Sequence, residues 1–139
     1  MRILFDTNIV LDVLLRREPW VAEAGRLWQA NDDGQIVGYI TVTSLTDIFY
    51  IAHRISGLDT AHQAVRVCLD GFEICPVDRS TLEQAAALPG NDFEDNLQIA
   101  CASLLGLDAI ATRNPQDFTA ATVPVLTLSE ALARLSDRE

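Results

Sequence analysis

Short apolar runs alternate with longer segments of helical period along this chain. The apolar runs predict buried strands, at residues 3–6, 36–41, 72–77, 109–112 and 123–126. The intervening segments space their apolar residues as helices do, around residues 9–14 and over 19–31, 44–56, 59–69, 78–88 and 93–105. This alternation is typical of parallel βα units. We therefore predict an α/β fold of three layers, αβα, with a short parallel sheet flanked by helices in a single domain over residues 1–139.

Turn and cap signals mark several of the predicted helix ends. Pro19 suits the first turn of a helix, and Asp78 suits the N-cap position before another. Gly57 stands just past the end of the helix predicted over 44–56, where a glycine commonly ends a helix.

The composition is that of one acidic globular domain. Hydrophobic residues make up 49% of the 139 positions, and 20 Asp and Glu residues outnumber ten basic residues, all of them arginine. The resulting net charge of -10 excludes a general electrostatic binder of nucleic acids or anionic membranes. A polyanion partner would need a local source of positive charge.

The cysteines and the N-terminal segment indicate a cytoplasmic protein. The three cysteines are odd in number and lack metal-ligand spacing, so we expect buried thiols in a reducing compartment. The first apolar run is interrupted by Asp6 and is too short for a signal peptide or a membrane span. We therefore expect no membrane association.

Carboxylates follow several of the predicted strands. Asp6 ends the first strand, Asp47 lies early in the helix after the second, Asp95 opens the helix over 93–105, and Asp117 comes soon after the fourth strand. In an open parallel sheet, ligands bind beyond the carboxyl ends of the strands. These four side chains are therefore the candidate site, with Asp92 as a further candidate.

Each carboxylate also has a purely structural explanation. Two pairs have the spacing of a capping box, Ser44 with Asp47 and Asp92 with Asp95. Asp6 could cap the helix that follows it, although an acid that closes a buried apolar strand is costly unless donors or a cation meet it. Asp117 could be an ordinary turn residue.

Taken together, the carboxylates favour a divalent cation. Converging carboxylates repel one another and raise one another's pKa unless a cation holds them ionised. An oxygen-only donor set favours Mg²⁺ or Mn²⁺ over zinc. His53 and His62 fall on predicted helices away from this edge, and we expect them to be surface or helix-face residues.

Four segments, in order, resemble the PIN domain family, in particular the short VapC-type toxins of bacterial and archaeal toxin-antitoxin pairs. The segments are residues 4–9 (LFDTNI), 46–50 (TDIFY), 92–98 (DFEDNLQ) and 112–118 (TRNPQDF). The resemblance spans residues 3 to about 128. It implies a parallel sheet flanked by helices and an acidic pocket that binds Mg²⁺ or Mn²⁺ and cleaves RNA.

The resemblance also assigns roles to individual residues. Asp6 and Asp95 match direct metal ligands, and Asp47 stands where many members have glutamate. Many members place an aspartate directly after the Thr-Arg pair, where this chain has Asn114; either Asp117 supplies the fourth carboxylate or the site has fewer acids. Residues that would orient carboxylates or phosphate are Thr7, Asn8, Ser44 and Thr112.

The resemblance further implies an antitoxin partner whose C-terminal segment covers an apolar groove and inserts an arginine among the acids. The helices with the aromatic residues would form that groove or a homodimer face, unless the aromatics are core; these residues are Trp20, Trp28, Phe49 and Tyr50. Arg113, beside the pocket, is a candidate contact for RNA phosphate.

Three functions compete at this point. The first is a metal-dependent endoribonuclease, the toxin of a toxin-antitoxin pair. The second is a non-catalytic PIN-like module that binds metal or RNA, motivated by the short Asp47 and the displaced fourth acid. The third, phosphoryl transfer through an aspartyl phosphate at Asp6, is disfavoured because Asn8 replaces the second acid of an Asp-x-Asp motif and the chain has no lysine.

Overall fold

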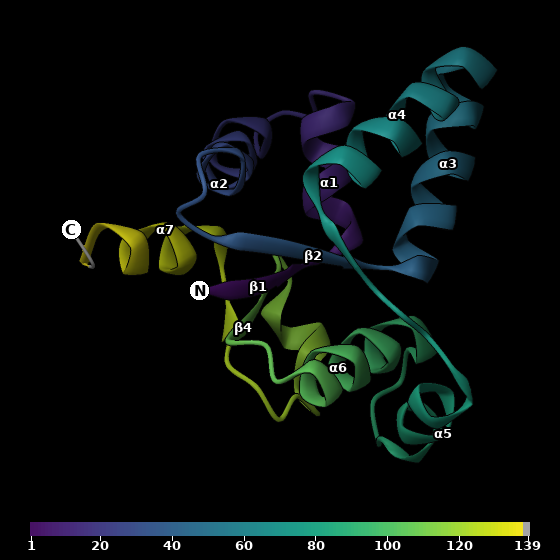
Figure 1. Cartoon of the computed structure of the whole chain (residues 1–139), viewed down its shortest axis with the longest axis vertical. Helices are drawn as coiled ribbons and strands as arrows, with labels where there is room; N and C mark the ends of the chain where they lie inside the picture. Colours follow the sequence, from purple (N-terminus) through teal and green to yellow (C-terminus); the bar gives the residue numbers. More distant parts are fainter. Residues whose placement is uncertain (138–139) are drawn as a thin grey trace.

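The computed structural model describes residues 1–137, in which five parallel strands form one sheet with the order β3-β2-β1-β4-β5 (Figure 1). The strands are β1 (Arg2–Phe5), β2 (Val37–Thr41), β3 (Glu73–Cys75), β4 (Ala109–Ala111) and β5 (Val125–Leu126). β1 is central, with Ile3 opposite Gly38 of β2 and Leu4 opposite Ile110 of β4. The predicted α/β fold with a short parallel sheet is confirmed.

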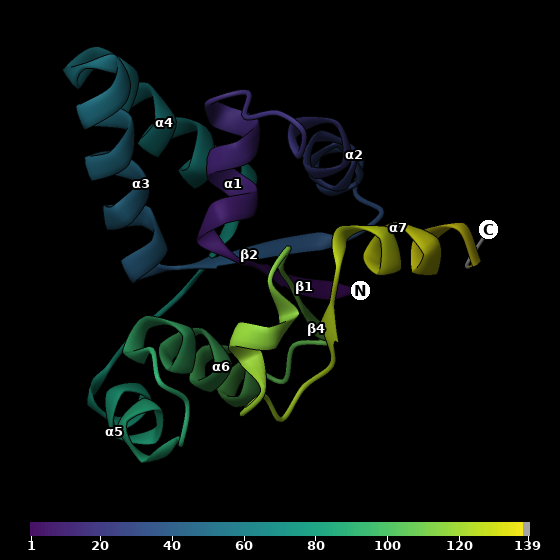
Figure 2. The ribbon, with the colours of Figure 1, turned by 180° about the vertical axis from the view of Figure 1, so that it is seen from behind.

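Helices cover both faces of this sheet (Figures 1 and 2). They are α1 (Thr7–Leu14), α2 (Val21–Asp32), α3 (Val42–Ser56), α4 (Leu58–Gly71), α5 (Arg79–Ala87), α6 (Phe93–Leu105), the 3₁₀ helix η1 (Pro115–Phe118) and α7 (Leu128–Asp137). α1 to α4 lie over one face, whereas α5 and α6 lie over the other. The fold therefore has the three predicted layers.

Alternating strand residues build a separate core on each face. Ile3 and Phe5 of β1 pack with the α1–α4 layer and with α7, whereas Leu4 packs with residues of α6 and with Phe118 of η1. All three β1 side chains are fully buried. A strand covered on both faces must be apolar at every position, which explains why the strand segments are short continuous apolar runs.

Two helices begin at positions other than those predicted. α2 begins at Val21, so Pro19 precedes the helix instead of opening it. The reason is the turn after α1, in which the Arg17 N–H donates to the Asp12 carbonyl and the Val21 N–H to the Arg17 carbonyl. α3 begins at Val42, because the Thr41 side chain accepts a hydrogen bond from the Ser44 N–H and caps the helix. Ser44 is therefore not the N-cap that the capping-box spacing indicated.

Other helix ends follow the sequence closely. α6 has the predicted bounds, and Asp78 caps α5 as expected by accepting from the Thr81 N–H. Gly57, with a φ of 91°, joins α3 to α4 in a hairpin that rises beyond the sheet (Figure 1). The C-terminal helix α7, which packs beside α2, was not predicted.

The cysteines and aromatic residues differ in burial. The thiols of Cys68, Cys75 and Cys101 are free and buried, as expected. Trp28 is a core residue that packs edge-to-face on Phe72. Tyr50 of α3, in contrast, is 66% exposed.

Among the helices of residues 1–137, none has the length and apolar character needed to cross a membrane.

Candidate acidic site

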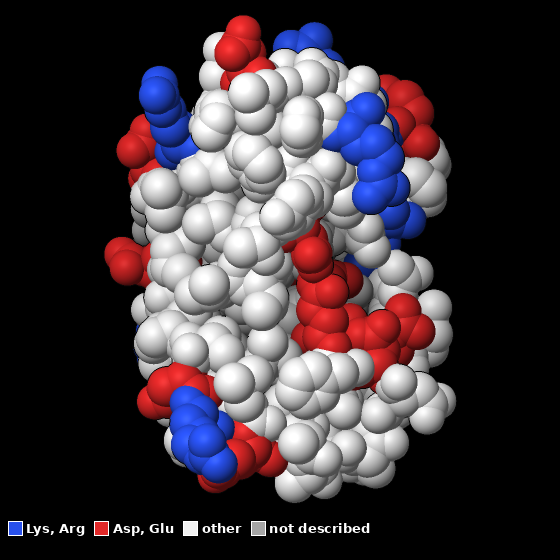
Figure 3. Space-filling view, turned by 90° about the vertical axis from the view of Figure 1, so that its right-hand side faces the viewer, with Lys and Arg blue, Asp and Glu red and all other residues white. Residues whose placement is uncertain are grey.

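The carboxyl ends of the strands meet at one side of the molecule, where acidic residues gather. Asp6 directly follows β1, α3 follows β2, and the turn to η1 follows β4. Seen from this side, Asp and Glu atoms fill a hollow partway down the surface (Figure 3). The α1–α4 layer and the α5–α6 layer lie on either side of this edge (Figure 1). We call this region the acidic cleft, defined by Asp6, Asp47, Asp92, Glu94, Asp95 and Asp117.

Asp6 is the most buried member of the acidic cleft, with 6% of its surface exposed. It occupies the N-cap position of α1, yet its side chain forms no capping hydrogen bond within the described residues. Instead, Oδ1 accepts from Gln98 Nε2 at 3.1 Å and Oδ2 accepts from Thr112 Oγ1 at 2.8 Å. Burial raises the pKa of Asp6, whereas the two side-chain hydrogen bonds oppose that rise. The capping alternative for Asp6 is therefore wrong.

Asp95 lies in the first turn of α6 beside Asp92. The Asp92 carboxylate accepts a hydrogen bond from the Asp95 N–H at 3.0 Å and caps the helix, as its spacing indicated. Burial, the larger cause, and the negative charges of Asp92, Asp6 and Asp117 together raise the pKa of Asp95 to about 7. Asp6, Asp95 and Asp117 are thus close enough to repel one another.

Asp117 is an exposed residue of η1. Its N–H donates to the Asn114 carbonyl, and the Asn114 N–H donates to Thr112 Oγ1, each at 3.0 Å. The charge of Asp117 also raises the pKa of Asp6. Of the two candidates for the fourth acidic position, the structure therefore brings the Asp117 carboxylate to the cleft, and Asn114 shapes the turn that carries it.

Asp47 projects from α3 and meets a carboxyl group absent from the predicted site, that of Glu94. Burial and a hydrogen bond between the two carboxyl groups raise the pKa of Glu94 to about 8. The sequence signal for Glu94 was its place in Asp92-Phe93-Glu94-Asp95, where it reads as a favourable acid in a first helical turn. The structure pairs Asp47 of α3 with Glu94 of α6, and these two helices belong to the layers on opposite sides of the sheet (Figure 1).

Hydrogen bonds between hydroxyl groups stabilise the wall of the acidic cleft. Thr7 Oγ1 and Ser44 Oγ share a hydrogen bond of 2.6 Å, and Ser44 also contacts Thr41. These bonds join the first turn of α1 to the first turn of α3. Together with Thr112, they fix the chain segments that carry Asp6 and Asp47.

A cavity of about 160 Å³ continues from the carboxylates, between the loop at residues 89–92 and η1. Asp92, Asp95 and Asp117 line it together with neutral polar side chains. The loop is tied down by buried Asn96, whose amide donates to the Leu88 and Gly90 carbonyls. The carboxylates therefore line a recess with a fixed rim.

The donor chemistry of the cleft suits a hard divalent cation. Its ligating atoms are carboxylate oxygens, and buried Gln98 Oε1, on the amide that binds Asp6, has no hydrogen-bond partner among residues 1–137. As the side chains stand, no three Asp, Glu, His or Cys residues in that range are arranged to hold a metal ion. Coordination would therefore need the carboxylates to turn toward one another.

A buried ion cluster that the sequence did not indicate lies on α1. The Asp12 side chain is fully buried and pairs with Arg17 (Nε to Oδ1, 2.8 Å) and with Arg113 (Nε to Oδ2, 3.0 Å). The Arg113 guanidinium carbon stacks 3.8 Å from the ring centroid of Trp20. Arg113 is therefore held by the protein itself. The expected contact between Arg113 and RNA phosphate finds no support in this arrangement.

Comparison with known proteins identifies the family to which this chain belongs. The family model described as PIN domain matches residues 2–116. The chain belongs to the PIN domain family. No curated protein matches the chain.

Solved structures of toxins and toxin-antitoxin complexes share this architecture. A sarcin-ricin loop cleaving VapC toxin of Mycobacterium tuberculosis is 18% identical, with a TM-score of 0.65 over 78% of this chain and 86% of that one. A toxin-antitoxin complex from Klebsiella pneumoniae is 25% identical, with a TM-score of 0.67 over 90% and 96%. DNA-bound VapBC from Salmonella typhimurium is 14% identical, with a TM-score of 0.72 over 92% and 98%.

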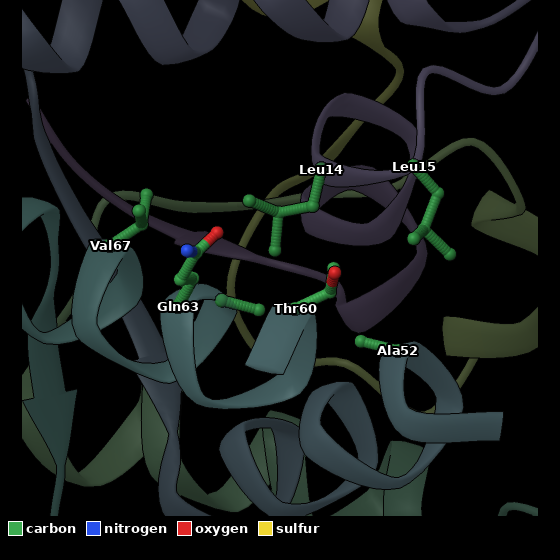
Figure 4. Close-up of a pocket in the computed structure, with 7 residues that line it drawn as sticks. Leu14, Leu15, Ala52, Thr60, Gln63 and Val67 are labelled. Carbon is green, nitrogen blue, oxygen red and sulfur yellow. The ribbon is translucent and has the colours of Figure 1, made fainter. Parts of the chain in front are cut away.

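An apolar pocket of this PIN domain lies away from the acidic cleft. It holds about 140 Å³ between the end of α1 and the α3–α4 hairpin. Leu14 and Leu15 point into it from α1, opposite Ala52 of α3 and Val67 of α4 (Figure 4). Large apolar side chains are also exposed on the same hairpin, at Tyr50, Ile55, Leu58, Val67 and Leu69. His53 and His62 lie exposed on this hairpin and pack against Phe49.

Proposed function

We propose that this PIN domain is a Mg²⁺- or Mn²⁺-dependent endoribonuclease. The observation that carries the proposal is the placement of Asp6 after β1, Asp95 in α6 and Asp117 in η1 at the carboxyl edge of the sheet, where the charge of Asp117 raises the pKa of Asp6 and the charges of Asp6 and Asp117 raise that of Asp95. Repulsion between these carboxylates would destabilise a purely structural site, whereas a bound cation would offset it. One solved toxin with this fold, that of Mycobacterium tuberculosis, is described as cleaving the sarcin-ricin loop.

The residues that would hold the cation are Asp6, Asp95 and Asp117, with Asp47 and Glu94 at the other wall. A bound divalent cation would lower the pKa of a water molecule and neutralise charge on the departing oxygen of the phosphodiester. Gln98 and Thr112 keep Asp6 oriented through their hydrogen bonds. Because its pKa is about 7, the Asp95 carboxyl group is partly protonated at neutral pH. Binding of a cation would therefore release protons from it.

The charge of the chain agrees with metal-dependent RNA binding. At a net charge of -10, the surface repels phosphate, and Arg113, the basic residue that follows β4, is paired internally. A cation held in the cleft would supply positive potential where the phosphate must approach. We therefore expect weak RNA affinity that depends on the metal.

We further propose that the protein is the toxin of a toxin-antitoxin pair. Its support is the apolar pocket between α1 and the α3–α4 hairpin, lined in part by exposed Val67, together with the toxin-antitoxin complexes among solved proteins with this fold. An apolar segment of an antitoxin would bury this surface, and a second copy of the chain is the other occupant we expect.

Cleavage and metal binding by two variants test the nuclease. Asp6→Asn and Asp95→Asn should abolish cleavage of a fluorescent RNA in Mg²⁺ or Mn²⁺, because each removes a charged ligand. Asp32→Asn, an exposed acid at the end of α2, is the matched control and should leave cleavage unchanged. Cleavage at the wild-type rate in both cleft variants would refute the assignment.

The non-catalytic alternative rests on the carboxylates not converging as they stand. Calorimetric titration with Mn²⁺, combined with the cleavage assay, separates the two functions. A nuclease should bind Mn²⁺ at millimolar concentration or below and cleave RNA. Binding of Mn²⁺ or RNA without cleavage would favour the non-catalytic module.

A further inference from the structure

The Asp12 ion cluster is built at a cost in stability. A buried charge such as that of Asp12 gives up its hydration, and apolar side chains of similar size often replace a buried ion pair without loss of stability. Asp12 lies in α1 between Leu11 and Val13, on a helix whose other buried positions are mostly apolar. Its charge therefore points to a requirement for fixed geometry rather than for stability.

The geometry that the cluster fixes is that of the turn after β4. Arg113 is the second residue of the turn at residues 112–117, between Thr112 and Asn114. Thr112 Oγ1 donates to Asp6 Oδ2 and accepts from the Asn114 N–H. The Asn114 carbonyl in turn accepts from the N–H of Asp117. One short segment thus carries the hydroxyl that orients Asp6, the arginine of the cluster and the fourth carboxylate.

α1 and this turn are joined at two points. At the N-terminal end of α1, Thr112 contacts Asp6 at 2.8 Å. Six residues further along α1, Arg113 contacts Asp12 at 3.0 Å. The contact of Arg113 Nε with Asp12 Oδ2 is an ion pair, and Arg113 Nη2 also donates a hydrogen bond to Asp12 Oδ1 at 3.5 Å. The stack on Trp20 completes the orientation of the guanidinium. Two attachment points fix the position of a segment and its rotation.

We propose that Arg113 is a positioning residue of the acidic cleft, which acts through Asp12 and Trp20. Its guanidinium holds the turn at residues 112–117 against α1, so that Thr112 and Asp117 stay beside Asp6. Its effect on metal binding and cleavage rests on the proposed nuclease function, whereas its effect on the turn does not.

Three variants test this role. Arg113→Met removes the ion pair and should weaken Mn²⁺ binding in calorimetry by about 10- to 100-fold, as partners that orient metal ligands do. Arg113→Lys keeps the charge but loses the planar stack, and it should restore part of that affinity. Arg79→Met, which removes an exposed arginine paired with Glu83 on α5, should leave the affinity unchanged.

Kinetics distinguish positioning from phosphate contact. A displaced Thr112 and Asp117 should lower kcat with little change in KM, whereas loss of an arginine that binds RNA phosphate would raise KM. A predominant rise in KM for Arg113→Met would therefore overturn the proposal.

Amide hydrogen exchange gives a readout that needs no metal. The Asn114 N–H is bonded to Thr112 Oγ1, so in Arg113→Met it should exchange about tenfold faster as the turn loosens. Wild-type exchange at Asn114 together with wild-type Mn²⁺ affinity would overturn the proposal. If Arg113→Met does not fold, Trp20→Leu, which removes only the stack, should show the same changes to a smaller degree, and their absence would overturn it equally. If the wild-type protein neither binds Mn²⁺ nor cleaves RNA, the proposed function fails, and Asn114 exchange still decides the positioning role.

Discussion

Asp95→Asn should stabilise the metal-free protein at pH 8. In the folded chain, burial and the charges of Asp92, Asp6 and Asp117 raise the pKa of Asp95 to about 7, against about 3.9 in an unfolded chain. The unfolded chain therefore releases this proton near pH 4, while the folded chain keeps it until about pH 7. The stability that this difference provides at low pH is lost progressively from about pH 4 to 7 and stays lost above.

The size of the gain follows from the rise in pKa. The rise corresponds to about 4 kcal/mol without solvent screening. Because Asp95 is only half-buried, water screens much of this, and we expect Asp95→Asn to raise the free energy of unfolding by about 1–2 kcal/mol at pH 8. At pH 4.5 the two proteins should differ little, since Asp95 is then largely protonated in the folded wild type.

Urea unfolding in EDTA at pH 4.5 and pH 8 measures both values. Asp32→Asn controls for the loss of one negative charge from a chain of net charge -10. A gain at pH 8 no larger than that of the control, or one of equal size at both pH values, would refute the reasoning. Excess Mn²⁺ should reverse the order, because the wild type binds the cation more tightly and is stabilised by mass action.

Three further predictions concern the surroundings of the cleft and the core. Thr112→Val leaves the buried Asp6 carboxylate without one donor and should cost about 1.5–3 kcal/mol in urea unfolding, whereas Thr46→Val on the exposed side of α3 should cost far less. A Cβ at Gly90 would collide with the Asn96 amide, so Gly90→Ala should lose about 1–3 kcal/mol of stability. Gly25→Ala, in an open position of α2, should instead gain about 0.5–1 kcal/mol; a gain at both positions would contradict the packing argument. The buried thiols, including Cys68 with its pKa raised to about 12 by burial, should react with a disulfide reagent only after denaturation, and rapid labelling of the native protein would show that they are accessible.

The order of elements could be predicted because buried parallel strands leave a strong signal. Most strand residues are apolar and buried, since helices cover both faces of the sheet, and each intervening helix has one apolar face. α7 carried a signal as well, with Leu128, Ala131, Leu132 and Leu135 at helical spacing. The start of α3 did not follow from spacing, because Thr41 ends β2 in an extended conformation and so takes the cap ahead of Ser44.

The sequence could predict only those residues of the candidate site whose location follows from their position relative to the strands. Asp6, Asp95 and Asp117 follow from the rule that parallel strands place their carboxyl ends at one edge. Glu94 and Asp12 could not be ranked, because their roles depend on side chains from distant segments. Asp12 finds its partner Arg113 101 residues away, and Glu94 finds Asp47 across the cleft. A sequence without structure shows neither contact.

The strand order has a consequence for how the protein is made. β1 is central in the sheet and β4 pairs beside it. Asp6 therefore lacks its neighbours Thr112 and Asp117 until more than a hundred further residues have been synthesised. A nascent chain that ends before β4 contains Asp6, Asp47 and Asp95 but has no partner strand to complete that edge of the sheet. Incomplete translation products therefore lack the assembled site. If the folded protein cuts RNA, that ability arises only after β4 and η1 have been synthesised.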